Sequence, residues 1–133
     1  AGNAALRRGR LLAALDAWRE AEELALESGD PELWAACRSN AVLGELRRGE
    51  FAAAEQLATE LLERFPRHEK GLYRRGLARE SLGDVRRARQ DFARAVGVNF
   101  MNAEAQEALS RVGGGRAAPE GDETGPRAAE TKK

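Results

Sequence analysis

The segment that decides the fold is GDVRRARQDFARA, residues 83 to 95, because its pattern occurs twice more along the chain. GEFAAAEQLATEL begins at Gly49, 34 residues earlier, and GRLLAALDAWREA begins at Gly9, another 40 residues earlier. Each segment opens with a glycine, a polar residue and an apolar residue, and has apolar residues five, nine and twelve positions after the glycine. These positions share one face of an α-helix. The sequence therefore predicts a repeating unit of helix, turn and helix.

One such helix pair cannot bury its apolar face alone, so we expect neighbouring pairs to stack into an array. Alanine, leucine, arginine and glutamate are abundant, and all four favour helix. We predict one all-α domain over residues 1–112, with repeats at about 1–30, 31–66 and 67–100 and a capping helix at 102–112. A turn at Gly9 is expected to divide the first repeat into helices of about residues 1–8 and 11–27.

Residues 113–133 differ in composition from the repeats. They contain glycine, proline and mixed charges but no large apolar residue. Such a segment cannot bury enough apolar surface to offset the entropy of ordering it. The sequence predicts a disordered tail over residues 113–133.

The overall charge narrows the classes of partner. Lys plus Arg and Asp plus Glu both number 22, so the net charge is zero. No global field attracts nucleic acid or an anionic membrane, and no apolar run is long enough to cross a bilayer.

Cys37 is the only cysteine, which rules out an internal disulfide and favours a reducing compartment. We expect a cytoplasmic location, with the nucleus as the alternative. Nothing in the sequence specifies an oligomeric state.

Residues suited to catalysis are few. His68, the only histidine, follows Pro66 in a polar turn with no evident Ser or Cys partner, so we interpret it as a surface residue. Cys37 lies among alanines and is interpreted as a small core residue. There is no cluster of metal ligands and no phosphate-binding glycine loop. The sequence predicts no catalytic residue, no metal and no cofactor, and therefore a chain that is not an enzyme.

Four polar residues are candidates for a binding site. Lys70 and Arg74 in the segment EKGLYRRG, residues 69–76, are four apart and share one side of a helix. Asn40 and Arg74 both lie nine residues before a turn glycine, and Asn3 falls on the first helix of the first repeat. The first helices of stacked pairs line the concave side of an array. Two amides and two cations in one groove suit a carboxylate, such as the C-terminus of a peptide.

Leu43, Tyr73 and Leu77 add apolar surface to the same predicted groove. Their presence leaves a second interpretation open. The array is then a scaffold that binds an internal helix or strand of another partner, and these three residues carry the affinity.

The 34-residue period, with Pro66 at the end of the second repeat, resembles the tetratricopeptide repeat. The resemblance implies a right-handed superhelix of three helix pairs and a capping helix. Asn3, Asn40, Lys70 and Arg74 are similar to the carboxylate clamp of co-chaperone tetratricopeptide domains. This resemblance implies that the partner is a cytosolic heat-shock chaperone of the 90 or 70 kDa class, with a C-terminus of the Glu-Glu-Val-Asp type. A fifth clamp residue, a lysine, is expected four positions before Asn3, which is before Ala1.

The segment EKGLYRRG, followed by ARQDF at 88–92, most resembles the third repeat of FKBP-type immunophilins, over about residues 67–95. Those proteins carry a peptidyl-prolyl isomerase domain before their repeats, and no isomerase sequence is present here. The resemblance therefore implies the non-catalytic part of an isomerase as another alternative.

Overall fold

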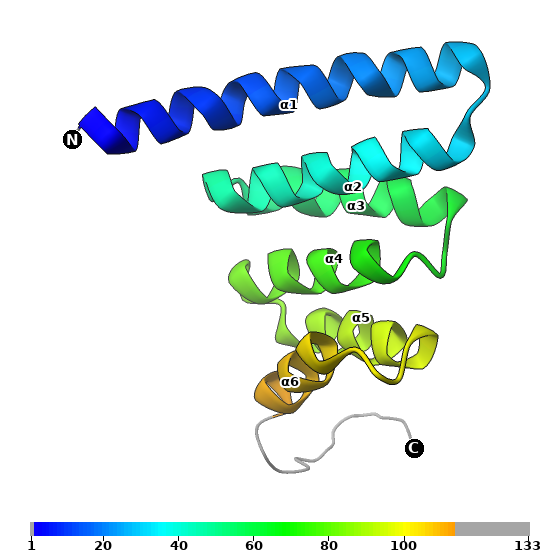
Figure 1. Cartoon of the computed structure of the whole chain (residues 1–133). Helices are drawn as coiled ribbons and strands as arrows, with labels where there is room; N and C mark the ends of the chain where they lie inside the picture. Colours follow the sequence, from blue (N-terminus) through cyan, green and yellow to red (C-terminus); the bar gives the residue numbers. More distant parts are fainter. Residues whose placement is uncertain (1, 114–133) are drawn as a thin grey trace.

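The computed structural model describes residues 2 to 113, and the side chains of residues 7 to 113; the predicted tail beyond Gly113 lies outside the described residues. The described chain forms six helices and no strand: α1 (Gly2–Ser28), α2 (Pro31–Arg48), α3 (Phe51–Arg64), α4 (Glu69–Ser81), α5 (Val85–Val98) and α6 (Ala103–Val112). Each helix packs on the next, and α2 also packs directly against α4. The result is a stack of antiparallel helices (Figure 1). The predicted all-α repeat architecture is confirmed.

Two of the glycine turns in the repeated pattern end helices. Gly49 and Gly83 have φ of +78° and +89°, a left-handed conformation that glycine adopts without steric cost. After Gly83, the side chain of Asp84 accepts a hydrogen bond from the Arg87 backbone N–H at 3.3 Å. This N-cap starts α5 and satisfies a donor that the helix leaves unpaired.

The expected turn at Gly9 is wrong, because α1 runs through it without a break. The first repeat is therefore one helix and not a pair. The residue after Gly9 differs from those after the other two glycines: Arg10 is a cation, which is unfavourable at the start of a helix, whereas Glu50 and Asp84 are acidic. The N-terminal end of α1 consequently projects past the end of α2 (Figure 1).

We expect Gly9→Ala to stabilise the protein by about 0.8–1 kcal/mol, because alanine is the better residue inside a helix. A Cβ at Gly9 would meet nothing within 4 Å. Gly49→Ala is the matched variant, and should destabilise the protein by about 1–2 kcal/mol because its φ is left-handed. Urea denaturation measures both. Loss of stability in the Gly9 variant would instead indicate a turn at that position.

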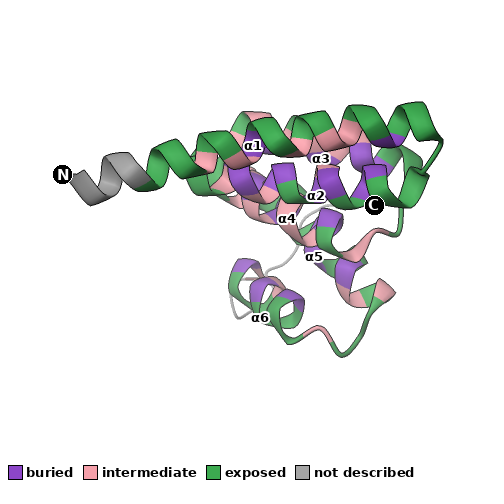
Figure 2. Cartoon of the chain, turned by 45° about the horizontal axis from the view of Figure 1, so that its top comes forward, coloured by how far each residue is buried: buried purple, intermediate pink, exposed green. Residues whose placement is uncertain are grey.

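The repeated apolar positions form the core of the second and third repeats. Their members are all fully buried: Ala54, Ala58, Leu61, Ala88, Phe92 and Ala95. Phe92 packs directly on Gly76 of α4, where an added Cβ would lie 2.5 Å from the ring carbon Cε1. A glycine at this position therefore lets α4 and α5 approach closely. Trp18, at the equivalent position of the first repeat, is only half-buried, because no helix folds back to cover it. The described part of the N-terminal half of α1 is mostly exposed (Figure 2).

A buried carboxylate outside the predicted groove links neighbouring helices. Asp91 of α5 is fully buried and accepts hydrogen bonds from Arg75 Nε at 3.0 Å and Nη2 at 2.8 Å. Arg79 Nη1 donates to the same carboxylate at 2.9 Å, and Arg79 Nε donates to Glu55 of α3 at 2.8 Å. Both arginines are therefore structural links between α3, α4 and α5 and not part of the predicted groove.

Candidate functional site

Arg74 lies where α4 crosses α2, and it is held there by a buried residue. Its Nη1 donates to the backbone O of Ser39 at 2.8 Å and to Ser39 Oγ at 2.9 Å. Ser39 is 3% exposed, so these bonds form on the inner surface of α2. Among the described residues, no acceptor is bonded to Arg74 Nε or Nη2. The guanidinium group thus keeps donors for another molecule.

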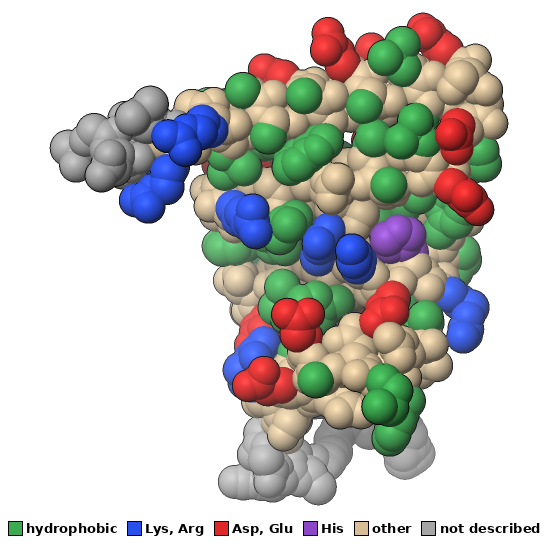
Figure 3. Space-filling view, in the orientation of Figure 1, with side chains coloured by type: hydrophobic (Ala, Val, Ile, Leu, Met, Phe, Trp, Pro, Cys, Tyr) green, Lys and Arg blue, Asp and Glu red, His purple; other side chains and the backbone are tan. Residues whose placement is uncertain are grey.

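Arg74 lines a hollow of about 490 Å³ between α2, α4 and the start of α6, which we call the clamp hollow. Its lining residues are Leu43, Arg47, Glu69, Lys70, Tyr73, Arg74, Leu77, Asn99, Asn102 and Glu104. Lys70 and Arg74, predicted to act together, do share this hollow. Basic side chains run across this face of the molecule from α1 to α4 (Figure 3).

The clamp hollow holds positive charge close together. The pKa of Arg74 lies below its usual value, because the group is partly buried and because Arg47 lies nearby. The pKa of His68 is lowered by burial and by the charges of Arg74 and Lys70. The part of both shifts that comes from neighbouring cations means that another positive charge is disfavoured here, and that an anion bound in the hollow would be stabilised.

His68 is not a plain surface residue as the sequence suggested. It caps α4, where its Nδ1 accepts a hydrogen bond from the Gly71 backbone N–H at 3.0 Å. This bond uses the lone pair of the neutral ring. The cap fixes the start of the helix that carries Lys70 and Arg74.

Acidification should destabilise the protein through His68. Because the folded-state pKa is lowered, the neutral ring contributes full stability above the unfolded value of about 6.5, and this is lost as the pH falls through the lower folded pKa. Urea denaturation as a function of pH measures the decline. In His68→Asn, which keeps a capping side chain but does not titrate, that part of the decline should vanish. An unchanged pH profile in this variant would contradict the assignment.

The opposite wall of the clamp hollow is acidic. Glu69 is bound by two amides from the turn before α6: Asn99 Nδ2 donates to it at 3.1 Å, and Asn102 Nδ2 donates to the same oxygen. Burial, followed by the charge of nearby Glu104, raises the pKa of Tyr73. The hollow is therefore polarised, with cations toward α2 and α4 and carboxylates toward α6. An anionic group is accommodated only on the cationic side.

The predicted amides have different positions. Asn40 is exposed on α2, directly after Ser39 and one turn before Leu43, but it does not line the clamp hollow. Asn3 lies in the first turn of α1, and its side chain is outside the described residues. Since α1 is continuous, this turn continues along the axis of α1 and does not fold back beside α2.

The three apolar candidates do lie in the groove. Leu43, Tyr73 and Leu77 line the clamp hollow and are half-buried. Tyr73 lies at the boundary between the groove and the core, because its ring also packs on Phe92 with centroids 5.8 Å apart.

Two groups in the site were missed from the sequence. Arg47 shares a helical face with Asn40 and Leu43, at offsets of seven and four residues, so the spacing alone could have identified it. Ser39 gave no such signal, because its contact with Arg74 depends on how α2 packs against α4.

Residues 7–113 offer little for other chemistry. They hold no group of three metal-ligating side chains, and no helix among the described residues is long and apolar enough to span a bilayer. Cys37 is buried, and desolvation together with the charge of Glu22 raises the pKa of its thiol. The thiolate, which is the reactive form, is therefore disfavoured.

No family model matches the sequence. Among curated proteins, the chain is similar to FK506-binding protein-like from Mus musculus, with 40% identity over 74 residues, and from Homo sapiens, with 36% identity over 74 residues. The match covers 56% of this chain but only 21% of the length of either relative.

Solved structures share the fold of this chain. The C-terminal TPR-containing domain of a Plasmodium falciparum protein named as an FK506-binding protein superposes with a TM-score of 0.71, at 17% identity, over 86% of this chain and 82% of that one. The fold is that of a tetratricopeptide-repeat (TPR) domain. The TPR domain also resembles the myosin chaperone UNC-45 from C. elegans, solved with an Hsp90 peptide, at 30% identity and a TM-score of 0.62, over 81% of this chain and 13% of that one. A third neighbour is the first TPR of Spaghetti, bound to the Hsp90 peptide SRMEEVD, at 20% identity and a TM-score of 0.59, over 77% of this chain and 93% of that one.

Proposed function

We propose that this TPR domain is a co-chaperone module that binds the acidic C-terminal peptide of a heat-shock chaperone of the 90- or 70-kDa class. Lys70 and Arg74 bind carboxylates of the peptide, and Asn40 contributes an amide from α2. Asn3 remains a predicted fourth member. Leu43, Tyr73 and Leu77 contact the apolar side chain of the peptide. A cytoplasmic location, which such partners require, belongs to the same proposal.

The observation that carries the proposal is the state of Arg74. Its guanidinium group is partly buried, oriented by Ser39 and close to the charges of Lys70 and Arg47. A charge-assisted hydrogen bond to such a group contributes about 1.5–3 kcal/mol. A chain end supplies two such acceptors on one carboxylate, which a guanidinium group can bind with two parallel bonds.

The comparisons support the same class of partner. The UNC-45 and Spaghetti structures were each solved with an Hsp90 peptide, and the second TPR domain of human RPAP3 was solved with the Hsp70 peptide SGPTIEEVD. Two of these peptides end in the sequence EEVD. It presents two glutamates, a valine and a terminal aspartate to a groove with cations and apolar side chains.

A titration with the peptide SRMEEVD tests the proposal, read by calorimetry or by fluorescence anisotropy. The full peptide should bind, and a peptide without the last four residues should not. The second candidate, an internal helix or strand bound by Leu43, Tyr73 and Leu77, is favoured by the apolar wall of the clamp hollow. It predicts that truncation has no effect, so that result would favour it over the clamp.

The proposal makes this chain the non-catalytic part of any isomerase that contains it. Two of the neighbours in the comparisons, from Spaghetti and from Plasmodium falciparum, are TPR domains. A prolyl-isomerisation assay of the chain should show no turnover. Measurable turnover would overturn this assignment.

A further inference from the structure

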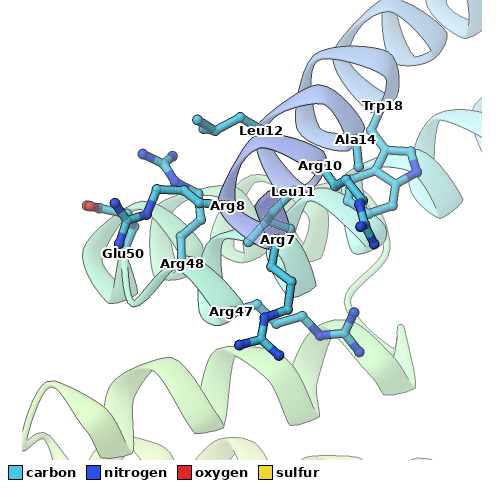
Figure 4. Close-up of a pocket in the computed structure, with 10 residues that line it drawn as sticks. All are labelled: Arg7, Arg8, Arg10, Leu11, Leu12, Ala14, Trp18, Arg47, Arg48 and Glu50. Carbon is cyan, nitrogen blue, oxygen red and sulfur yellow. The ribbon is translucent and has the colours of Figure 1, made fainter. Parts of the chain in front are cut away.

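A second hollow, of about 830 Å³, lies between the N-terminal half of α1 and the end of α2. We call it the basic hollow. It is lined by Arg7, Arg8, Arg10, Leu11, Leu12, Ala14, Trp18, Arg47, Arg48 and Glu50. In Figure 4, Arg7 from α1 and Arg47 from α2 extend into the same space. Five guanidinium groups and one carboxylate line the hollow, and Arg48 is paired with Glu45, so an anionic occupant would reduce the repulsion among the remaining cations.

The basic hollow also exposes apolar surface. Trp18 is half-buried, whereas Ala58 and Phe92, the equivalent residues of the other repeats, are fully buried. Leu12 is 41% exposed. An occupant with acidic and apolar side chains on one segment therefore fits the hollow better than a small inorganic anion.

Such a segment exists in α1 itself, because the charges of this helix are segregated. Residues 2–15 contain three arginines and no acid, whereas residues 16–28 contain five acids and one arginine. This order opposes the helix macrodipole, which favours acids at the N-terminus and cations at the C-terminus. The charges without an ion pair among the described residues are Arg7, Arg8 and Arg10 at one end and Glu20, Glu23 and Glu27 at the other.

We propose that two copies of this chain associate through an antiparallel pairing of their α1 helices. The pairing places the acidic half of each α1, residues 16–28, against the basic hollow of the other copy. A two-fold axis makes both contacts at once, as in most homodimers. The 27-residue helix is about 40 Å long at 1.5 Å per residue, so both charged ends meet across one interface.

The facing surface of α1 suits a close approach. Its residues follow a spacing of four and three, which gives one continuous stripe of a helix: Arg10, Ala14, Ala17, Ala21, Leu24 and Ser28. Glu20 and Glu27 flank this stripe on one side, the position from which charged side chains reach a partner helix. Leu24 is 63% exposed in the single chain. Pairing covers it and brings it toward the apolar part of the basic hollow. The contact does not use Lys70 or Arg74, and Arg47 is the one residue that lines both hollows.

Sedimentation velocity of the 133-residue chain tests the pairing. The expected species has twice the mass of the 14.5 kDa chain. The dissociation constant should rise between about 0.05 M and 0.5 M NaCl, because salt screens the charge contacts. The proposal would be overturned if the chain stays monomeric at low salt at protein concentrations up to about 0.5 mM. The dissociation constant would then be too high for a specific complex.

Charge reversal gives the sharper test. The triple variants R7E/R8E/R10E and E20R/E23R/E27R should each raise the dissociation constant at least about tenfold, because attractive contacts become repulsive. An equimolar mixture of the two should form a heterodimer. All six residues except Glu27 lie inside α1, beyond its terminal turns, and their side chains have no ion pair to lose among the described residues, so the melting temperature should stay close to that of the wild type, which separates lost pairing from unfolding. R67E/R86E, on other exposed sites, is the control.

Three results would overturn the pairing by this route. The first is dimerisation that persists in both triple variants. The second is a mixture of the two that stays monomeric. The third is an R7E/R8E/R10E variant that sediments with the same mass as the wild type but binds SRMEEVD more weakly. That result would make the basic hollow a peptide subsite.

Discussion

Arg74→Ala is expected to weaken binding of an acidic C-terminal peptide at least about tenfold, since each charge-assisted bond it makes contributes about 1.5–3 kcal/mol. Lys70→Ala should weaken binding in the same direction. Lys70 is exposed and has no ion pair among the described residues, so its removal leaves the fold intact. Arg74→Ala also removes the bonds to Ser39 that join α4 to α2. Isothermal titration calorimetry measures both affinities.

The control for both variants is Arg86→Ala. Arg86 is exposed on α5, outside the clamp hollow, and its removal changes the net charge by the same amount. Thermal melts of all three variants show whether the fold is retained. Equal loss of affinity in the Arg86 variant would mean that the peptide responds to overall charge alone. Unchanged affinity in folded Lys70→Ala and Arg74→Ala would show that the clamp hollow does not bind the peptide.

Asp91→Ala should destabilise the protein by about 3–5 kcal/mol, the usual effect of removing one partner from a buried ion pair. The side chain of Asp91 is fully buried, and those of Arg75 and Arg79 are 11% and 12% exposed. Without the carboxylate, two guanidinium groups from α4 stay largely buried and lose the anion that offsets the cost of burying their charge. Urea denaturation measures the change in the free energy of unfolding.

Arg94→Ala is the matched control for Asp91. Arg94 contacts the same carboxylate at 3.5 Å, but its side chain is 58% exposed. Exposed ion pairs contribute about 0–1 kcal/mol, so this variant should remain close to the wild type. Similar destabilisation in the two variants would show that burial does not control how much the ion pairs of Asp91 contribute to the free energy of unfolding.

The repeat pattern in the sequence was sufficient to predict the core of the second and third repeats. Ala58 and Phe92, at equivalent positions, are both fully buried. The same pattern failed at Gly9, because a glycine permits a turn but does not require one. The residue after the glycine also differs: acidic residues, Glu50 and Asp84, follow Gly49 and Gly83, whereas the cation Arg10 follows Gly9 and is unfavourable at the start of a helix.

The candidate site was predictable where it depends on spacing within one helix. Lys70 and Arg74 are four residues apart and do line one hollow. Contacts between helices were not predictable in the same way. Ser39 meets Arg74 only because α2 packs on α4, and Glu69 becomes part of the wall through two amides from the turn before α6. Such pairs are separated by about 30 residues or more, beyond the reach of local periodicity.

The most direct test of the account is a titration with SRMEEVD carrying either a free or an amidated C-terminus. The account predicts that amidation weakens binding at least about tenfold, because it removes the charge of the terminal carboxylate while leaving the side chains unchanged. Equal affinity for the two peptides would contradict the central claim that Lys70 and Arg74 bind the end of a chain.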